Sequence, residues 1–337
     1  MKSIKLNREF ILKQFIKLGA IILMSALVQA CAPAAYNIDT PEPSTISYED
    51  VLDEIKTKSA DFNVVDSRSE EGMSFSYGRL PADLKLNGAS IEPISFLKNS
   101  TEQELKARGI DTNFSSSDGI DIEINKFIIR NHRVSGFSPF VTFTMLSGDI
   151  VTDDGKERVA AFIKRGKVPV WSFDEIVQPT LNEPLDLVAK ELAAKINAKL
   201  FDRKISNNEV QTLIKKINSP SQDESNDLKY LDVYQLGFGN NKTAIPALVE
   251  MAKSKPEYIR LSAISSLGIL GARDEIGFLK SIYADSKLWQ DRGMAIKAIA
   301  DIGNDEAMAF LNEIALDNQG DTKEQSWNRE IIELYTR

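Results

Sequence analysis

The side chains that most often perform chemistry in proteins are scarce in this sequence. Its 337 residues include one histidine, His132, and one cysteine, Cys31. A Ser-His-Asp or Cys-His arrangement would have to use His132, whose neighbours Asn131 and Arg133 are typical of an exposed loop or strand end. Zinc and other metals that need clustered imidazole or thiolate ligands are disfavoured as well. We predict no enzymatic activity, no metal and no cofactor.

One short pattern could still indicate catalysis. Ser95 and Lys98 have the S-x-x-K spacing of penicillin-interacting enzymes, but the companion motifs S-D-N and K-T-G are absent from the sequence. A pattern with two fixed positions arises by chance in a chain of this length. We therefore interpret it as a coincidence.

Four residues near the C-terminal end are candidates for binding a protein partner. Arg260 and Arg292 are 32 residues apart in equivalent positions, and Tyr258 and Trp289 lie close to them in the sequence. Such arginines can bind a partner or hydrogen-bond to the adjacent repeat, and such aromatic residues can anchor a peptide or pack between helices. The sequence leaves both interpretations open. Nucleic acid is disfavoured as a partner, because the net charge is −8 and no basic stripe is present.

The first thirty residues have the pattern of a secretory signal. Five basic residues and one acid precede the apolar run 18–28, which is too short to span a membrane comfortably. Val28, Ala30 and Cys31 resemble the lipobox of bacterial lipoproteins, in which the cysteine is acylated and the chain is cut just before it. The resemblance implies a signal peptide at 1–30 and a lipidated Cys31. Because Ala32 rather than Asp follows the cysteine, it also implies an outer-membrane anchor facing the periplasm.

Cleavage before Cys31 would make the chain more acidic. Losing five of the 41 basic residues and one of the 49 acids changes the net charge from −8 to −12. We therefore expect contact with the membrane to come from the acyl chains rather than from anionic lipid. Residues 31–44 are small and rich in proline, and we predict that they form an extended tether.

Residues 45–203 predict an α+β domain, an antiparallel sheet with covering helices. Alternating apolar residues indicate half-buried strands, and amphipathic spacing indicates helices that cover the apolar face. The predicted strands are 62–66, 120–129, 141–145 and 159–173. The predicted helices begin at Ser47, Pro93 and Pro184.

This order of elements resembles YajG-type lipoproteins and the auxiliary lipoproteins of ABC transporters. The resemblance is carried by the segments 64–68, 107–110, 120–124 and 184–201. It implies an accessory role in the periplasm and brings no catalytic residues. It also keeps open an alternative function, in which the domain binds a lipid or another apolar ligand for a transport system.

A repeat occupies residues 206–337. Gly239, Gly271 and Gly303 are spaced by 32 residues, and the apolar residues before each glycine recur in the same phase. The segment 259–274 resembles the short HEAT-type repeat that phycobilisome lyases also contain. The resemblance implies an all-α HEAT-like solenoid of stacked helix pairs, whose concave surface is lined by the second helix of each pair.

These observations together predict a membrane-tethered periplasmic lipoprotein without enzymatic activity. Its helical repeat would bind another envelope protein and serve as a scaffold in envelope assembly or transport. The sequence does not name the partner, the oligomeric state or the face of the repeat that binds.

Overall fold

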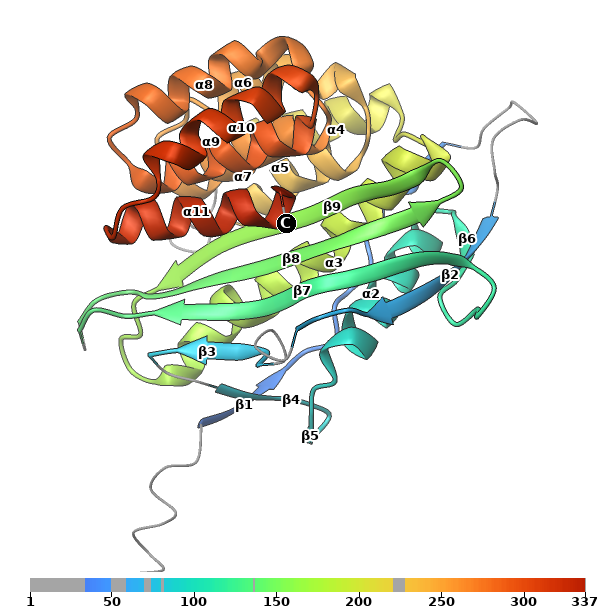
Figure 1. Ribbon diagram of the computed structural model, residues 1–337, viewed down its shortest axis with the longest axis horizontal. Helices are drawn as coiled ribbons and strands as arrows, with labels where there is room; N and C mark the ends of the chain where they lie inside the picture. The colour runs from blue at the N-terminus through green and yellow to red at the C-terminus, as the bar shows by residue number, and fades with distance from the viewer. Residues whose placement is uncertain are drawn as a thin grey trace, which may run out of the picture.

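The computed structural model describes residues 34–49, 59–69, 74–79, 82–135, 137–220 and 228–336. A sheet-containing N-terminal region is followed by a helical C-terminal region (Figure 1). Within these ranges, no helix is long and apolar enough to cross a membrane. The predicted signal peptide and Cys31 lie outside the described residues.

The main sheet is mixed, with the order β6-β2-β7-β8-β9 and with β3 paired to β7. Strands β7, β8 and β9 are antiparallel, whereas β2 and β3 run parallel to β7, and β6 runs parallel to β2. The prediction of an antiparallel sheet is therefore wrong for β2, β3 and β6. The connection from β2 to β7 contains a helix, and a long crossover of this kind permits parallel pairing. The strands are β2 (Ser59–Asp66), β3 (Ser76–Gly78), β6 (Asp111–Asn113), β7 (Ile120–His132), β8 (Phe140–Thr152) and β9 (Gly155–Lys167).

The alternation of apolar residues changes phase inside β7 because the strand contains a bulge. The pairing with β8 shifts register between Ile124 and Lys126. An extra residue reverses which face the following side chains occupy. Ile124 and Phe127 therefore both lie in the core, although they are three residues apart.

The N-terminal segment is part of the fold. Strand β1 (Ala34–Ile38) pairs in parallel with β4 (Ala82–Leu86), which also pairs with β5 (Ala89–Ser90). The sequence predicts an extended tether that includes residues 34–38. They form a strand instead because Ile38 is buried in the core and Asp39 exchanges hydrogen bonds with Asn182.

Residues 45–49 are not helical, unlike our prediction of a helix that begins at Ser47. The Tyr48 hydroxyl donates to the Phe238 carbonyl at 2.9 Å, and the buried Arg108 donates to Ser44 and to Gln235 at 3.0 and 2.6 Å. This extended segment therefore joins the two regions of the chain. The rest of the predicted helix, 50–58, lies outside the described residues.

Helices α2 (Pro93–Ala107) and α3 (Glu183–Ile196) pack in the N-terminal region, as predicted. The predicted extension of the last strand to residue 173 is wrong. The backbone amides of Val170, Trp171 and Ser172 donate to the Glu175 carboxylate instead of to a neighbouring strand. Two short helical turns precede α3, Phe173–Ile176 and Gln178–Asn182, and one follows it, Asn197–Phe201.

The C-terminal region consists of helix pairs that are joined at the predicted glycines. Gly239 and Gly303 cap α5 and α9, and Gly271 follows α7. Gly271 and Gly303 have φ values of 59° and 61°, which glycine adopts most readily, whereas in the first pair Asn240 takes this conformation. The helices are α4 (Asn207–Asn218), α5 (Lys229–Phe238), α6 (Ile245–Met251), α7 (Glu257–Ile269), α8 (Ile276–Asp285), α9 (Trp289–Ile302), α10 (Asp305–Asp317) and α11 (Lys323–Thr336).

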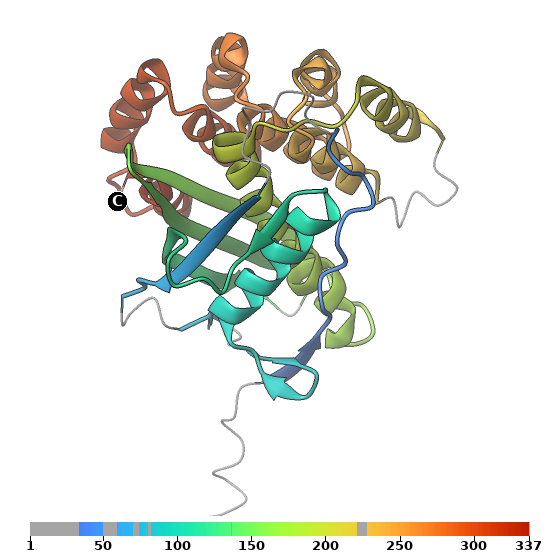
Figure 2. The ribbon, with the colours of Figure 1, turned by 90° about the vertical axis from the view of Figure 1, so that its right-hand side faces the viewer.

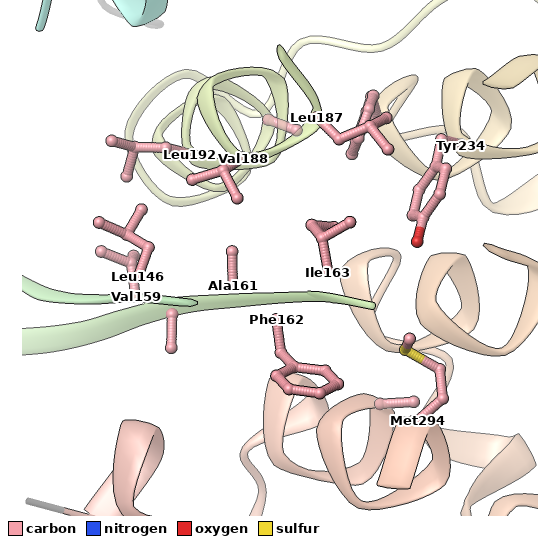
Figure 3. Close-up of a cluster of buried hydrophobic side chains, with 14 of the residues drawn as sticks. Leu146, Val159, Ala161, Phe162, Ile163, Leu187, Val188, Leu192, Tyr234 and Met294 are labelled. Carbon is pink, nitrogen blue, oxygen red and sulfur yellow. The ribbon is translucent and has the colours of Figure 1, made fainter. Parts of the chain in front are cut away.

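The first helix of each pair, not the second, faces the sheet. Helices α5 and α7 contact α3, whereas α9 and α11 contact β9, and α6, α8 and α10 lie on the outside (Figures 1 and 2). The row of helices therefore curves around the edge strand β9. In Figure 3, Ala161 and Ile163 point toward α3, while Phe162 points to the opposite side, toward α9. Both faces of β9 are covered, where the sequence predicted one solvated face.

Candidate functional site

The two predicted partner-binding arginines form ion pairs between neighbouring helices. Arg260 Nε lies 3.0 Å from the Asp291 carboxylate, and Arg260 Nη1 donates to the Ser254 carbonyl at 2.9 Å. Arg292 pairs with Glu324 at 2.5 Å. One arginine thus joins α7 to α9, and the next joins α9 to α11. This repeated contact is the structural role that the sequence left open as an alternative.

The two predicted aromatic residues lie at the junction between the helices and the sheet. The Tyr258 hydroxyl accepts from the Gly166 amide and donates to its carbonyl, both at 3.0 Å. The Arg165 guanidinium lies 3.9 Å from the centre of the Tyr258 ring. The Trp289 ring packs against Trp327, with centroids 4.5 Å apart. These side chains hold the two regions together, and no partner contact is needed to explain them.

His132 is the last residue of β7 and is separated from any nucleophile suggested by the sequence. The centroid of its ring lies 5.6 Å from the ring centroid of Trp327, in an edge-to-face arrangement. Partial burial, and then the charges of Lys323, Arg130 and Arg79, lower the pKa of His132. Ser95 lies in α2, in another part of the fold.

A buried ion network, which sequence reasoning did not identify, joins α3 to α9 and α11. It consists of Glu191 and Lys195 on α3, Lys297 and Asp301 on α9, and Tyr335 on α11. Lys297 Nζ lies 2.6 Å from Glu191 and 2.7 Å from Asp301. Lys195 Nζ lies 2.7 and 2.5 Å from the same two carboxylates. The Tyr335 hydroxyl donates to Asp301 at 2.6 Å.

The electrostatics of this network keep Lys297 and Asp301 charged and Tyr335 neutral near neutral pH. Burial alone would lower the pKa of Lys297, but the carboxylates of Asp301 and Glu191 outweigh it and raise that pKa. Burial likewise opposes ionisation of Asp301, and Lys195 and Lys297 outweigh it, so the pKa of Asp301 is lowered. Burial, then Asp301 and Glu191, raise the pKa of Tyr335. Groups fixed in this way cross-link the fold and are poorly suited to proton transfer.

A cleft of about 580 Å³ lies beside the buried network, and we call it the junction cleft. Its walls come from the start of β9, the end of α3 and the turns that follow α7 and α9. Lys195, Asp301 and Tyr335 form part of its floor, so the network and the cleft share a wall. Five cationic and three anionic side chains line it: Arg158, Lys195, Lys199, Lys242, Arg273, Glu157, Asp202 and Asp301.

Two of these cations are available to a ligand. Lys199 pairs with Glu157, Arg158 pairs with Asp149 at 2.7 Å, and Lys195 belongs to the network. Lys242 and Arg273 are exposed, and no ion pair of either occurs within the described parts of the chain. The junction cleft therefore contains two cationic side chains that form no ion pair within the described ranges, with Asp274 and Glu275 in the neighbouring turn.

No metal site accompanies the cleft in the portion that the structure describes, because no three His, Cys, Asp or Glu side chains are grouped to hold an ion. No protein-family model matches the sequence, and no curated protein matches it. The proposals below therefore rest on the chain's own residues.

Proposed function

We propose that this protein is a periplasm-facing lipoprotein, anchored to the outer membrane through acyl chains on Cys31, that serves as a non-enzymatic scaffold. Its C-terminal helices form a HEAT-like array that binds another envelope protein. The observation that carries the proposal is the positive charge of the junction cleft. The partner would contribute an acidic segment to this cleft.

The charge of the cleft differs in sign from the charge of the chain. The sequence carries a net charge of −8, yet the cations of the cleft outnumber its anions by two. Opposite charge on a partner accelerates association, and the cationic cleft disfavours surfaces that are themselves basic. Lys242 and Arg273 follow α5 and α7 at corresponding turns, so they are spaced to meet an extended peptide.

The helical repeat supports the scaffold role in a second way. Its inner helices pack against α3 and β9, and this packing fixes the array in one position relative to the sheet. A rigid array presents its turns and its outer helices α6, α8 and α10 without an entropic cost of ordering on binding. The binding surface of the proposal is therefore the edge at the glycine turns and not the concave face.

Charge reversal in the cleft tests the proposal in the full-length protein. We would capture the protein from membranes after crosslinking and identify what is bound to the wild type and to Lys242→Glu/Arg273→Glu. The double reversal should weaken capture of a specific envelope protein about tenfold or more, with a weaker salt dependence of the remaining binding. Lys287→Glu is the matched control, because Lys287 is an exposed lysine in the α8–α9 loop, outside the cleft.

Two results would count against the proposal. Capture that is equally strong in the double reversal and in Lys287→Glu would show that the cleft does not bind the partner. Detection by mass spectrometry of an unmodified mature peptide that contains Cys31 would show that the lipid anchor does not exist. Deletion of 206–337 is a poorer test, because it would uncover Phe143 and Phe162 on the sheet.

A further inference from the structure

Most of the exposed large hydrophobic side chains lie at one end of the sheet. Of the eight such side chains in the described ranges, five belong to two short segments, and we call these five the aromatic rim. Phe137 and Trp171 are the most prominent, with 96% and 92% of their surface exposed. The rim consists of Val134, Phe137, Val168, Val170 and Trp171.

Strand pairing places both segments of the rim at the same end. Val134 and Phe137 lie in the turn between β7 and β8, and residues 168–171 leave β9 directly after Lys167. In the β8–β9 pairing, Phe140 stands opposite Lys167. The turn and the exit from β9 are therefore neighbours, at the left-hand end of the sheet in Figure 1.

The backbone around Trp171 is fixed by hydrogen bonds. The amides of Val170, Trp171 and Ser172 donate to the Glu175 carboxylate at 2.9, 2.8 and 3.1 Å. The Val170 and Trp171 amides, acting most strongly, lower the pKa of Glu175. An organised loop thus holds the Trp171 indole in a solvent-exposed position.

The turn that carries Phe137 is organised in a similar way. Ser138 Oγ accepts from the amides of Val134 and Ser135 at 3.0 and 2.8 Å, and it donates to the Ser135 carbonyl at 2.9 Å. The Phe137 amide donates to Ser135 Oγ at 3.3 Å. Two separate segments therefore each present an aromatic side chain from a hydrogen-bonded backbone.

The chain enters the fold beside this rim. Asp174, three residues after Trp171, is close enough to Tyr36 of β1 that burial and then the charge of Asp174 raise the pKa of Tyr36. Asp39, just after β1, is bonded to Asn182. Only two residues separate Cys31 from Ala34 in the sequence, so an acyl chain on Cys31 would be attached close to the start of β1. An acyl chain on Cys31 would hold this end of the molecule against the bilayer.

We propose that the aromatic rim inserts Phe137 and Trp171 into the phospholipid interface and so orients the anchored protein. The proposal rests on the lipid anchor of the proposed function for the supply of a nearby bilayer. Tryptophan favours the boundary between hydrocarbon and headgroups, and the two rings protrude rather than line a groove. Lys167 and Arg133 flank the rim and balance the carboxylates of Asp174 and Glu175, which follow Trp171 in the same loop.

Tryptophan fluorescence tests the insertion directly. The chain has three tryptophans, and Trp289 and Trp327 pack against each other inside the fold. With the membrane-extracted protein in zwitterionic phosphatidylcholine vesicles, brominated acyl chains should quench the share of emission that belongs to Trp171. Trp171→Ala should show no quenching, which assigns the signal. Phe137→Ala should reduce the quenching, because one of the two inserted rings is gone.

A second measurement does not depend on acylation. Cys31→Ser protein should bind the same vesicles weakly in a flotation assay, and Phe137→Ala/Trp171→Ala should bind about tenfold less or weaker still. Leu316→Ala is the matched control, because Leu316 is 76% exposed on α10 and outside the rim. It should leave both quenching and flotation unchanged.

The outcomes separate the rim from the anchor. Anchored protein whose Trp171 is not quenched overturns the proposal while the lipoprotein assignment stands. If the protein proves not to be acylated at Cys31 but still binds vesicles in a way that requires Phe137 and Trp171, the proposal for the rim is supported and the lipid anchor is refuted. A concentration-dependent dimer that the double variant abolishes, without quenching by lipid, would assign the rim to self-association and overturn its role at the membrane.

Discussion

Removal of Lys297 should be among the most damaging single changes in the protein. The side chain is 0% exposed, and its ammonium lies 2.6 and 2.7 Å from the carboxylates of Glu191 and Asp301. The network has two cations and two anions, so Lys297→Met leaves one buried negative charge without compensation. Breaking a buried pair in this way costs about 3–5 kcal/mol, out of a typical stability of about 5–15 kcal/mol.

The assay is urea unfolding at pH 7.5 of four proteins: wild type, Lys297→Met, Glu191→Gln and the double variant. The double variant restores neutrality, because Lys195 then faces Asp301 alone. We expect it to be more stable than Lys297→Met by about 2 kcal/mol, although it lacks two charges instead of one. The non-additivity is the signature of a charge-balanced network.

The pH dependence gives an independent check. In the wild type, the pKa of Lys297 is raised above 10.5, so its contribution to stability is present below pH 10.5 and is lost above it. The pKa of Asp301 is lowered below 3.8, so its contribution is lost only as the pH falls through that range. The contributions of Lys297 and Asp301 are therefore constant between pH 5.5 and 7.5. In Lys297→Met, a carboxylate without its cation has a raised pKa and is destabilising at the higher pH.

The cost of Lys297→Met should therefore be smaller at pH 5.5 than at pH 7.5. Other groups titrate equally in both proteins and cancel in the difference. A cost below about 1 kcal/mol, or an equal cost at both pH values, would refute the charge argument. In that case the carboxylate left without its cation would have to be accommodated by water or by rearranged helices.

Three further predictions concern single contacts. Burial, partly offset by Lys190, raises the pKa of Asp186 to about 6. Because the unfolded chain ionises near pH 3.8 and folded Asp186 only near 6, stability falls as the pH rises from about 4 to about 6 and is level above that. Wild type should therefore lose about 1.4 kcal/mol between pH 5 and 8, and Asp186→Asn should not. Gly268→Ala would place a Cβ 2.5 Å from the Ala298 Cα and should cost about 2 kcal/mol or more, measured as a drop in Tm. Gly277→Ala, whose Cβ meets nothing within 4 Å, should be neutral or stabilising by about 0.5 kcal/mol in the same assay. Tyr258→Phe removes both hydrogen bonds to Gly166 and should cost about 1–3 kcal/mol in urea unfolding, and a cost near zero would mean that water replaces the hydroxyl.

The parts of the fold that follow from local periodicity were predictable. The alternation in 120–129 and 159–163 indicated strands, and the glycine spacing indicated the turns after α5, α7 and α9. Strand direction was not predictable, because alternation is the same in parallel and antiparallel pairs. Residues 34–38 were missed because a short strand with one buried side chain, Ile38, has no detectable period.

The buried ion network could not be predicted from the sequence. Glu191 and Lys195, four residues apart on α3, have the spacing of an exposed ion pair. The same is true of Lys297 and Asp301 on α9. The available signal was the apolar context of Lys297, which lies between Ala295-Ile296 and Ala298-Ile299 and so falls within a buried helix. Only the packing of α3 against α9 shows that the two pairs neutralise each other.

The geometry of β9 connects the two proposals. The strand is 13 residues long, with Glu157 of the junction cleft near its start and Lys167 beside the aromatic rim at its end. At 3.3 Å per residue, these two points are roughly 30 Å apart. Because only two residues separate Cys31 from β1 in the sequence, an anchor at Cys31 would leave little tether to supply this distance, and the rigid strand would supply it. With the rim in the bilayer interface, the cleft would face the periplasm well clear of the lipid headgroups. An acidic partner could then reach Lys242 and Arg273 without approaching an anionic membrane surface that repels it.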